Sequence, residues 1–283
     1  MKIQYWGTAA AEGIPAIFCG CSVCNEARRL GGKYRRARSQ VMLDDELLVD
    51  FGPDTYMNSV RFGHDLSRLS DVLITHVHDD HFYSMEMLNR RVGFANSMKT
   101  ETLVFHGSED VELLARKVWG LAIGDNKVDS FMESKRIAFD KLLPYEKKCI
   151  LGFSVTPIPA NHDTPNPYIY IFEKNGKSML LFNDSAILPP EELEWIKESG
   201  IKFDLVSYDC TYADRDDAKR HLGIPDILRL RKIFTDNGNY KDSTIEIITH
   251  FSHNTKTVGY ADMKKIADSH GLVLAYDGLE IEF

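Results

Sequence analysis

One run of seven residues carries the clearest chemical signal in the sequence, Thr75-His76-Val77-His78-Asp79-Asp80-His81. Three imidazoles and the Asp80 carboxylate fall within six residues of this run. Imidazole and carboxylate ligands together suit zinc, manganese or iron. A loop can turn its first two histidines toward one ion and Asp80 and His81 toward a second, whereas a single ion seldom takes four ligands from so short a loop. The spacing therefore favours a two-metal site over a solvated polar loop.

The elements that position this run can be read from the apolar pattern. The run directly follows Asp71–Ile74, which reads as a buried strand. Further strands are expected at Lys2–Trp6, Gln40–Leu43, Leu47–Asp50, Thr102–Phe105, Phe153–Ile158, Tyr168–Glu173, Ser178–Phe182, Leu205–Tyr208, Ile245–Ile248 and Val273–Ala275. Helices are expected at Pro53–Phe62, Glu109–Trp119, Glu191–Glu198, Pro225–Phe234 and Tyr260–Ser269.

The order of these elements bounds the architecture. Two strand-then-helix halves of similar size predict stacked sheets flanked by helices. No Pro-, Gly- or Ser-rich linker marks a boundary, so we expect one domain over residues 1–283. The segment 121–148 has weak periodicity and mixed charge, and we expect it to be an insertion over one end of the fold.

The His-x-His-x-Asp-His pattern resembles that of the metallo-β-lactamase-fold hydrolases. The resemblance implies an α/β fold, namely the four-layer αβ/βα sandwich with two mixed β-sheets, and a two-metal site at one edge. It also implies three later ligands, each after a strand: a histidine, a bridging acidic residue and a last histidine. His162, Asp184 and His250 stand at such positions. By this resemblance the first metal is bound by His76, His78 and His162, the second by Asp80, His81 and His250, and Asp184 bridges the two.

A second group of residues that can bind a metal is the cysteine trio of Cys19-Gly20-Cys21-Ser22-Val23-Cys24. The chain has five cysteines and no recognisable secretion signal, which does not suggest a disulfide framework. Three thiolates can bind one tetrahedral zinc if a fourth ligand is present. His253, three residues after His250, is the candidate. A structural zinc is therefore expected, with a redox cysteine trio or simple buried thiols as the alternatives.

The Cys-x-Cys-x-x-Cys and His-x-x-His motifs narrow the resemblance to the PhnP-like phosphodiesterase branch, with PqqB-type proteins as near relatives. The resemblance runs from Gly7-Thr8-Ala9 to Tyr276-Asp277-Gly278. It implies hydrolysis of a phosphodiester in a small or cyclic phosphate by a metal-bridged hydroxide. Two divalent ions, zinc or manganese with iron ranked behind them, would generate that hydroxide and neutralise phosphoryl charge. Asp80 would help to orient the attacking water.

The leaving alkoxide needs a proton, which a histidine outside the metal set can donate. His221, ahead of the expected helix Pro225–Phe234, is the candidate general acid. The PhnP-like branch also carries a catalytic histidine that is not a ligand in this region, and a surface or helix-capping histidine is the alternative. Asp209 and Tyr212 are expected to line the pocket. The basic run 35–39 either attracts phosphate or forms a solvated turn.

Composition limits the possible partners. Hydrophobic residues make up 43% of the chain and charged residues 27%, which excludes global disorder. The net charge of −8 disfavours long nucleic acids and anionic membranes, so tRNA processing is disfavoured and a small phosphate ester, small nucleotides included, is the expected substrate. No apolar run approaches the roughly 18 residues of a membrane span, and no signal-peptide pattern is present, so a cytoplasmic protein is expected. The oligomeric state stays open, with a homodimer as one option.

Three other functions are compatible with the same motifs. They are hydrolysis of another ester or a thioester on the same metals, diiron redox chemistry on persulfides, and a non-catalytic PqqB-type role in a cofactor pathway. In the superfamily that the chain resembles, diiron redox members tend to carry a carboxylate where His81 stands. PqqB-type relatives can lack part of the ligand set, whereas every ligand position is filled here. Both points favour a hydrolase.

Overall fold

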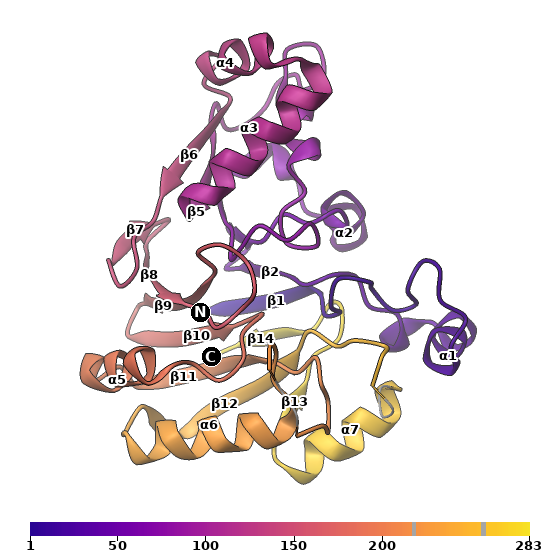
Figure 1. Cartoon of the computed structure of the whole chain (residues 1–283), viewed down its shortest axis with the longest axis vertical. Helices are drawn as coiled ribbons and strands as arrows, with labels where there is room; N and C mark the ends of the chain where they lie inside the picture. The colour runs from indigo at the N-terminus through magenta and orange to yellow at the C-terminus, as the bar shows by residue number, and fades with distance from the viewer. Residues whose placement is uncertain (217–218, 256–258) are drawn as a thin grey trace.

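The computed structural model describes residues 1–216, 219–255 and 259–283. In this part of the chain, two seven-stranded sheets stack face to face, and helices cover both outer faces (Figure 1). The expected four-layer αβ/βα sandwich is therefore confirmed. No helix in the described residues has the length and apolar character needed to cross a membrane.

The first sheet has the strand order β14-β1-β2-β3-β4-β5-β6. Its strands β3 to β6 run parallel to one another, and the remaining neighbours are antiparallel. The strands are β1 (Lys2–Gly7), β2 (Gln40–Leu43), β3 (Leu47–Val49), β4 (Asp71–Leu73), β5 (Leu103–Gly107), β6 (Ile137–Lys141) and β14 (Glu280–Glu282).

The second sheet has the order β13-β12-β11-β10-β9-β8-β7, and its strands β10 to β13 are parallel. Strand β8 also runs in the direction of β10, because both pair antiparallel with β9. The strands are β7 (Lys148–Ile150), β8 (Phe153–Pro159), β9 (Tyr168–Lys174), β10 (Lys177–Phe182), β11 (Phe203–Asp209), β12 (Tyr240–Thr249) and β13 (Val273–Leu274).

Helices lie outside both sheets. The α-helices are α1 (Ser22–Leu30), α2 (Thr55–Phe62), α3 (Glu109–Ile123), α4 (Asp125–Glu133), α5 (Pro190–Ser199), α6 (Ile224–Asp236) and α7 (Tyr260–Ser269). Short 3₁₀ helices span Gly32–Tyr34, Leu66–Arg68 and Ser84–Arg90. Figure 1 shows α2, α3 and α4 beside the first sheet and α5, α6 and α7 beside the second.

Alternating side chains fill the apolar space on the two faces of each sheet. On β1, Tyr5 packs between the sheets, whereas its neighbour Trp6 packs under the outer helices of the first sheet. On β10, Leu181 faces the space between the sheets and Phe182 faces the outer helices of the second sheet. Each sheet is thus buried on both faces, which explains why its strands read as continuous apolar runs.

The carboxyl ends of parallel strands emerge at one edge of a sheet, and both sheets present that edge at the same place. Two hydrogen bonds tie the loop after β4 to the second sheet. The Tyr170 hydroxyl donates to the Ile74 carbonyl at 2.7 Å, and the Tyr168 amide donates to the Thr75 carbonyl at 2.8 Å. Loops from both sheets therefore lie against each other where the ligand-type residues stand.

The structure differs from the expected elements in a few places. The expected helix Pro53–Phe62 begins at Thr55. The segment 121–148 holds the end of α3, all of α4 and the edge strand β6, which pairs in parallel with β5 and extends the first sheet. The expectation that this segment is an insertion, and that the chain is a single domain, stays a prediction. Helix α1 and strands β6, β7 and β14 were missed, because they are short or lie at sheet edges with mixed polarity.

Candidate functional site

Three of the expected ligands lie together at the edge of the sandwich. His76 and His78 come from the loop after β4, and His162 comes from the loop after β8. Their facing nitrogens are close: His78 Nδ1 lies 3.0 Å from His76 Nε2 and 3.1 Å from His162 Nε2. Nitrogens about 2.0–2.1 Å from a tetrahedral ion lie about 3.3 Å apart, so this group has the spacing of a metal site.

A second group of four residues adjoins the first. Asp80 and His81 come from the loop after β4, Asp184 follows β10 and His250 follows β12. His81 Nε2 lies 3.1 Å from Asp80 and 3.2 Å from Asp184 Oδ2, and His250 Nε2 lies 2.8 Å from Asp184 Oδ1. Asp184 Oδ2 is also 3.6 Å from His76 Nε2, so this carboxylate stands between the two groups.

The polar atoms of the second group are close together without forming hydrogen bonds. Three buried atoms have no hydrogen-bond partner among the described residues: His81 Nε2, His250 Nε2 and Asp184 Oδ1. Buried polar atoms normally find partners, because burial without one costs about 1–3 kcal/mol. Short distances without hydrogen-bond alignment are expected when lone pairs converge on a shared ion. The residues present therefore fit a metal site.

The pKa values in the second group show that its buried carboxylates need positive charge nearby. Burial alone would raise the pKa of Asp80 and Asp184, yet His81 and His250 lower the pKa of both carboxyls. Burial alone would lower the pKa of His250, but Asp184 raises it to about 10. The buried carboxylates are thus stabilised by positive charge nearby, which bound cations would supply.

The rings of His81 and His250 are each held by a contact to Nδ1. His81 Nδ1 lies 2.6 Å from Asp50 Oδ2, and the other oxygen of Asp50 accepts from the Thr75 amide and hydroxyl, both at 2.9 Å. His250 Nδ1 lies 2.7 Å from the Thr211 hydroxyl. Such contacts fix the ring orientation of metal-binding histidines. Sequence reasoning missed the role of Asp50, and the available signal was a carboxylate at the end of the strand next to β4.

Backbone strain collects at the same residues. Asp50, Asp184 and His250 have φ angles of 68°, 44° and 61°, in the left-handed region that side chains other than glycine disfavour. Each stands just after a strand, where such a φ angle turns the chain sharply. Gly52 allows a close approach beside them, since a Cβ there would lie 2.1 Å from the Asp80 carbonyl oxygen. Strain of this kind is typical of functional sites.

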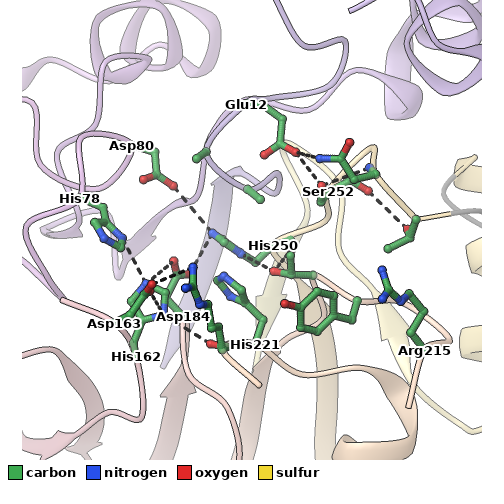
Figure 2. A pocket seen from close by; sticks show the side chains of 17 residues that line it. Glu12, His78, Asp80, His162, Asp163, Asp184, Arg215, His221, His250 and Ser252 are labelled. Carbon is green, nitrogen blue, oxygen red and sulfur yellow. Dashed lines mark hydrogen bonds and ion pairs between the residues drawn. The ribbon is translucent and has the colours of Figure 1, made fainter. Parts of the chain in front are cut away.

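A cavity of about 440 Å³ opens beside both groups (Figure 2). This volume is in the range of small-molecule sites. Tyr212 lines the cavity as expected, whereas Asp209 is fully buried behind it. The lining also includes Ala10, Ala11, Glu12, His78, Asp80, His162, Asp163, Asp184, Thr211, Arg215, Arg220, His221, His250, Ser252, Asn254 and Thr255.

His221 lies over the two ligand groups. Its ring stacks on His250 with 5.5 Å between centroids, and it meets His162 at 5.1 Å. Its Nδ1 lies 2.6 Å from Asp209 Oδ2, so Nε2 is the nitrogen that can face a ligand. Burial alone would lower the pKa of His221, but the Asp209 carboxylate raises it. An oriented imidazole therefore stands at the cavity wall.

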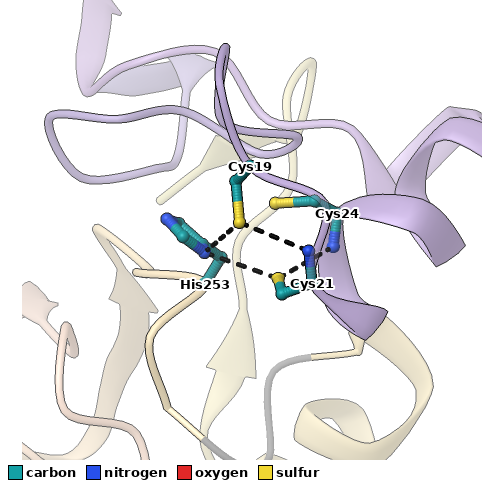
Figure 3. A group of neighbouring side chains, drawn as sticks. All are labelled: Cys19, Cys21, Cys24 and His253. Carbon is teal, nitrogen blue, oxygen red and sulfur yellow. Dashed lines mark hydrogen bonds between the residues drawn. The ribbon is translucent and has the colours of Figure 1, made fainter.

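The cysteines form a separate cluster with His253 (Figure 3). His253 Nδ1 lies 3.5 Å from Cys19 Sγ and 3.6 Å from Cys21 Sγ. Ligands of a tetrahedral zinc, with Zn–S of about 2.3 Å and Zn–N of about 2.0–2.1 Å, are separated by about 3.6 Å. Burial alone would raise the pKa of the Cys21 thiol, but the Cys24 amide and His253 lower it to about 6. The cluster thus fits a zinc site.

The basic run 35–39 is not a fully solvated turn, because Arg36 is buried while Arg35 is exposed. Arg36 is only 4% exposed, and its guanidinium donates to Thr8 Oγ1 and the Ala275 carbonyl, both at 2.7 Å. Arg35 donates to the Arg28 carbonyl in the last turn of α1 at 2.9 Å. None of the residues 35–38 lines the cavity beside the histidines.

Replacing Asp50 tests the support of His81. Asp50→Asn keeps the size of the side chain but removes the charge that holds the His81 ring. We expect metal affinity at the active site to fall about 10–100-fold, as is usual when such a supporting contact is lost. Competition with a chromogenic chelator measures this affinity.

Asp71 offers a matched control in the same sheet. Its Oδ1 lies 2.8 Å from His106 Nε2, and neither residue lines the cavity. Asp71→Asn should leave metal affinity unchanged. An Asp50→Asn protein that binds metal as tightly as the wild type would contradict the supporting role.

The chain was compared with known families and structures. The family model described as Anti-Pycsar protein Apyc1 matches residues 39–237, a range that leaves out the cysteine cluster, His250 and His253. No curated protein matches the sequence.

Solved structures share the fold over the whole chain at low identity. A diphosphatase of the PhnP family is 20% identical with a TM-score of 0.74, and the match covers 100% of this chain and 97% of that one. Zn(2+)-bound PqqB from Methylobacterium extorquens is 17% identical with a TM-score of 0.73, and both chains are covered completely. The metallo-β-lactamase fold protein YhfI from Bacillus subtilis is 17% identical with a TM-score of 0.64, covering 100% of this chain and 99% of that one.

The fold predicted from the His-x-His-x-Asp-His pattern is thus confirmed by structures of that fold. Because the family model spans well over half of the sequence, the chain belongs to the Anti-Pycsar protein Apyc1 family, with the metallo-β-lactamase fold.

Proposed function

We propose that this chain is a metal-dependent phosphodiesterase that hydrolyses a small phosphate ester, with cyclic nucleotides as the preferred class. The observation that carries the proposal is the set of buried, unpartnered ligand atoms converging beside an open cavity. The chain belongs to the Anti-Pycsar protein Apyc1 family, and one solved structure with the same fold is a diphosphatase of the PhnP family. A cavity of about 440 Å³ accommodates a ligand of nucleotide size.

Two divalent ions would occupy the two ligand groups. One is assigned to His76, His78 and His162, the other to Asp80, His81 and His250, and Asp184 contributes to both. Nitrogen and carboxylate ligands suit zinc or manganese. When bound, such ions supply a nucleophile at neutral pH and neutralise charge on the phosphoryl group. Asp80 lines the cavity and lies beside this centre, where it can hold the attacking water in position.

His221 would donate the proton that the leaving group needs. Asp209 contacts its Nδ1 and raises its pKa against the effect of burial, which leaves Nε2 as the nitrogen that would hold a proton toward the cavity. Asp209 is itself held, because its other oxygen accepts from the Thr211 amide at 2.8 Å and the Thr211 hydroxyl at 2.7 Å. In this arrangement Asp209 acts as a positioning residue, and His221 is the group that touches the substrate.

The Cys19, Cys21, Cys24 and His253 cluster would hold a structural zinc. Cys19 and Cys21 lie just before α1, and His253 lies in the loop after β12. A zinc at this point would join the N-terminal loop to the loop that carries His250. Zinc at such a site contributes directly to the free energy of folding.

A metal-supplemented activity screen tests the proposed function. With manganese or zinc, we expect hydrolysis of bis-p-nitrophenyl phosphate and of 3′,5′- or 2′,3′-cyclic nucleotides, because the cavity combines a dimetal site with a proton donor. A chelator should abolish the activity, and metal should restore it. Hydrolysis of thioesters without any hydrolysis of phosphodiesters would contradict the proposal.

Two neighbouring histidines separate the metal sites. His253→Ala should release one zinc and lower Tm by about 5 °C or more, since about 1 kcal/mol corresponds to about 2–4 °C in a chain of this size. His250→Ala should abolish activity while the fold persists. Elemental analysis of the metal-replete wild type should give about three ions per chain. A reproducible value near one, or a His253→Ala protein with full metal content and unchanged Tm, would contradict these assignments.

The role of His221 depends on the leaving group. A nitrophenolate leaves without protonation, whereas a sugar alkoxide needs a proton as its bond breaks. His221→Ala should therefore lower kcat on a cyclic nucleotide by about 10²–10⁴-fold and affect bis-p-nitrophenyl phosphate far less. His270→Ala, at the exposed end of α7, is the control and should leave both rates unchanged. Equal losses on both substrates would show that His221 positions or binds the phosphate instead.

A further inference from the structure

Glu12 places a carboxylate in the wall of the candidate active site. It lines the same cavity as His162 and His221, and Figure 2 shows it on the opposite side from those two histidines. It belongs to the loop after β1, whereas both histidines come from the second sheet. A ligand that reached from the metal groups across the cavity would meet this side chain.

The two oxygens of Glu12 have different surroundings. Oε1 accepts from the Ser252 hydroxyl at 2.6 Å and from the Asn254 side-chain amide at 2.8 Å, and it lies 3.4 Å from His253 Nε2. Oε2 has no partner among the described residues, and the side chain is 29% exposed. One oxygen is thus fixed by the loop after β12, and that loop holds the other oxygen in a defined place in the cavity.

A fixed carboxylate has a clear preference among the parts of a phosphate ester. It repels the phosphate, and it accepts strong hydrogen bonds from neutral donors such as the N–H of a base or the hydroxyl of a sugar. The phosphate therefore belongs at the metal groups, and the organic part of the substrate belongs at Glu12.

We propose that Glu12 determines specificity by accepting a hydrogen bond from a donor on the organic group of the phosphodiester. The proposal rests on the proposed function, because it takes the metal groups to be the place of the phosphate. It distinguishes nucleotide-like esters, which present N–H and O–H donors, from esters that present none. Glu12 does not take part in the bond-breaking step.

The conservative variant Glu12→Gln separates substrate recognition by this side chain from its hydrogen bonds to the loop after β12. In Glu12→Gln, the amide oxygen can still accept from Ser252 and Asn254, while the amide NH₂ replaces the free carboxylate oxygen. Ser252 and Asn254 keep their hydrogen bonds to residue 12, and the cavity loses the charged acceptor oxygen of Glu12. Glu12→Ala would remove both and is therefore less informative.

The measurement compares guanosine 3′,5′-cyclic monophosphate, which carries donors on base and sugar, with bis-p-nitrophenyl phosphate, which carries none. In Glu12→Gln we expect KM for the cyclic nucleotide to rise about 10–100-fold, the usual effect of losing a hydrogen bond to a charged group, with kcat little changed. Both constants for bis-p-nitrophenyl phosphate, the metal content and Tm should stay at wild-type values.

Two analogues identify which donor is used. Purine riboside 3′,5′-cyclic monophosphate lacks the base N–H donors, and 2′-deoxyguanosine 3′,5′-cyclic monophosphate lacks the sugar hydroxyl. The analogue that lacks the recognised donor should bind wild type and Glu12→Gln equally well, whereas the other should discriminate between them. If both analogues discriminate as strongly as the parent nucleotide, neither donor is recognised and the proposal is overturned.

The control is Asp163→Asn, which removes the same charge from another part of the cavity wall, where Asp163 pairs with Arg220 at 2.8 Å. It should not change the preference for the donor-bearing substrate. The same loss of preference in both variants would reveal a general charge effect and overturn the proposal, as would equal losses on both substrates or no change in Glu12→Gln.

Calorimetric binding of the cyclic nucleotide to metal-loaded protein gives a readout that needs no turnover. If the wild type hydrolysed no phosphodiester, the proposed function would fail. The Kd ratio between wild type and Glu12→Gln would still decide the role of Glu12, with an increase of about tenfold or more supporting it and equal Kd values overturning it.

Discussion

The site depends on the Asp184 carboxylate, which meets His81 of the first sheet and His250 of its own sheet. Asp184 follows a strand of the second sheet and lies 3.2 Å from His81, which follows a strand of the first. A buried carboxylate cannot stay charged without compensation, so the sheets must present positive charge to it at this edge. His81 and His250 lower the pKa of Asp184, and bound metal ions would supply the positive charge.

The same demand accounts for the strained backbone around the site. A strand that continued straight would carry Asp184 or His250 away from the opposite sheet. Left-handed φ angles at both residues turn their side chains inward, at a cost of order 1–3 kcal/mol each. Such conformations persist because the flanking strands are buried on both faces and fix the chain on either side. The apolar layers therefore stabilise a geometry that the loops alone would not adopt.

Residue types and order predict the fold and the proposed ligands better than they predict the supporting contacts. The apolar runs fixed the positions of β4, β10 and β12, and the ligand-type residues follow these strands directly. Asp50 and Glu12 were missed because their roles arise from neighbours distant in the sequence, His81 and the loop 252–254. Such pairings depend on which strands lie side by side, and local patterns do not contain that information. Arg36 was misjudged for the same reason, since its partner Ala275 lies near the other end of the chain.

The loop after β12 shows how support and chemistry are combined in a few residues. His250 belongs to the second ligand group, Phe251 exchanges backbone hydrogen bonds with the loop after β1, and His253 meets the cysteines. The Phe251 amide donates to the Thr8 carbonyl at 2.9 Å, and the Ala10 amide donates to the Phe251 carbonyl at 3.0 Å. Phe251 and His253 both contact the N-terminal loop. The His250 ring therefore cannot move without disturbing the contacts of these two residues. The cysteine cluster and the backbone bridge thus act on the catalytic geometry through one short segment.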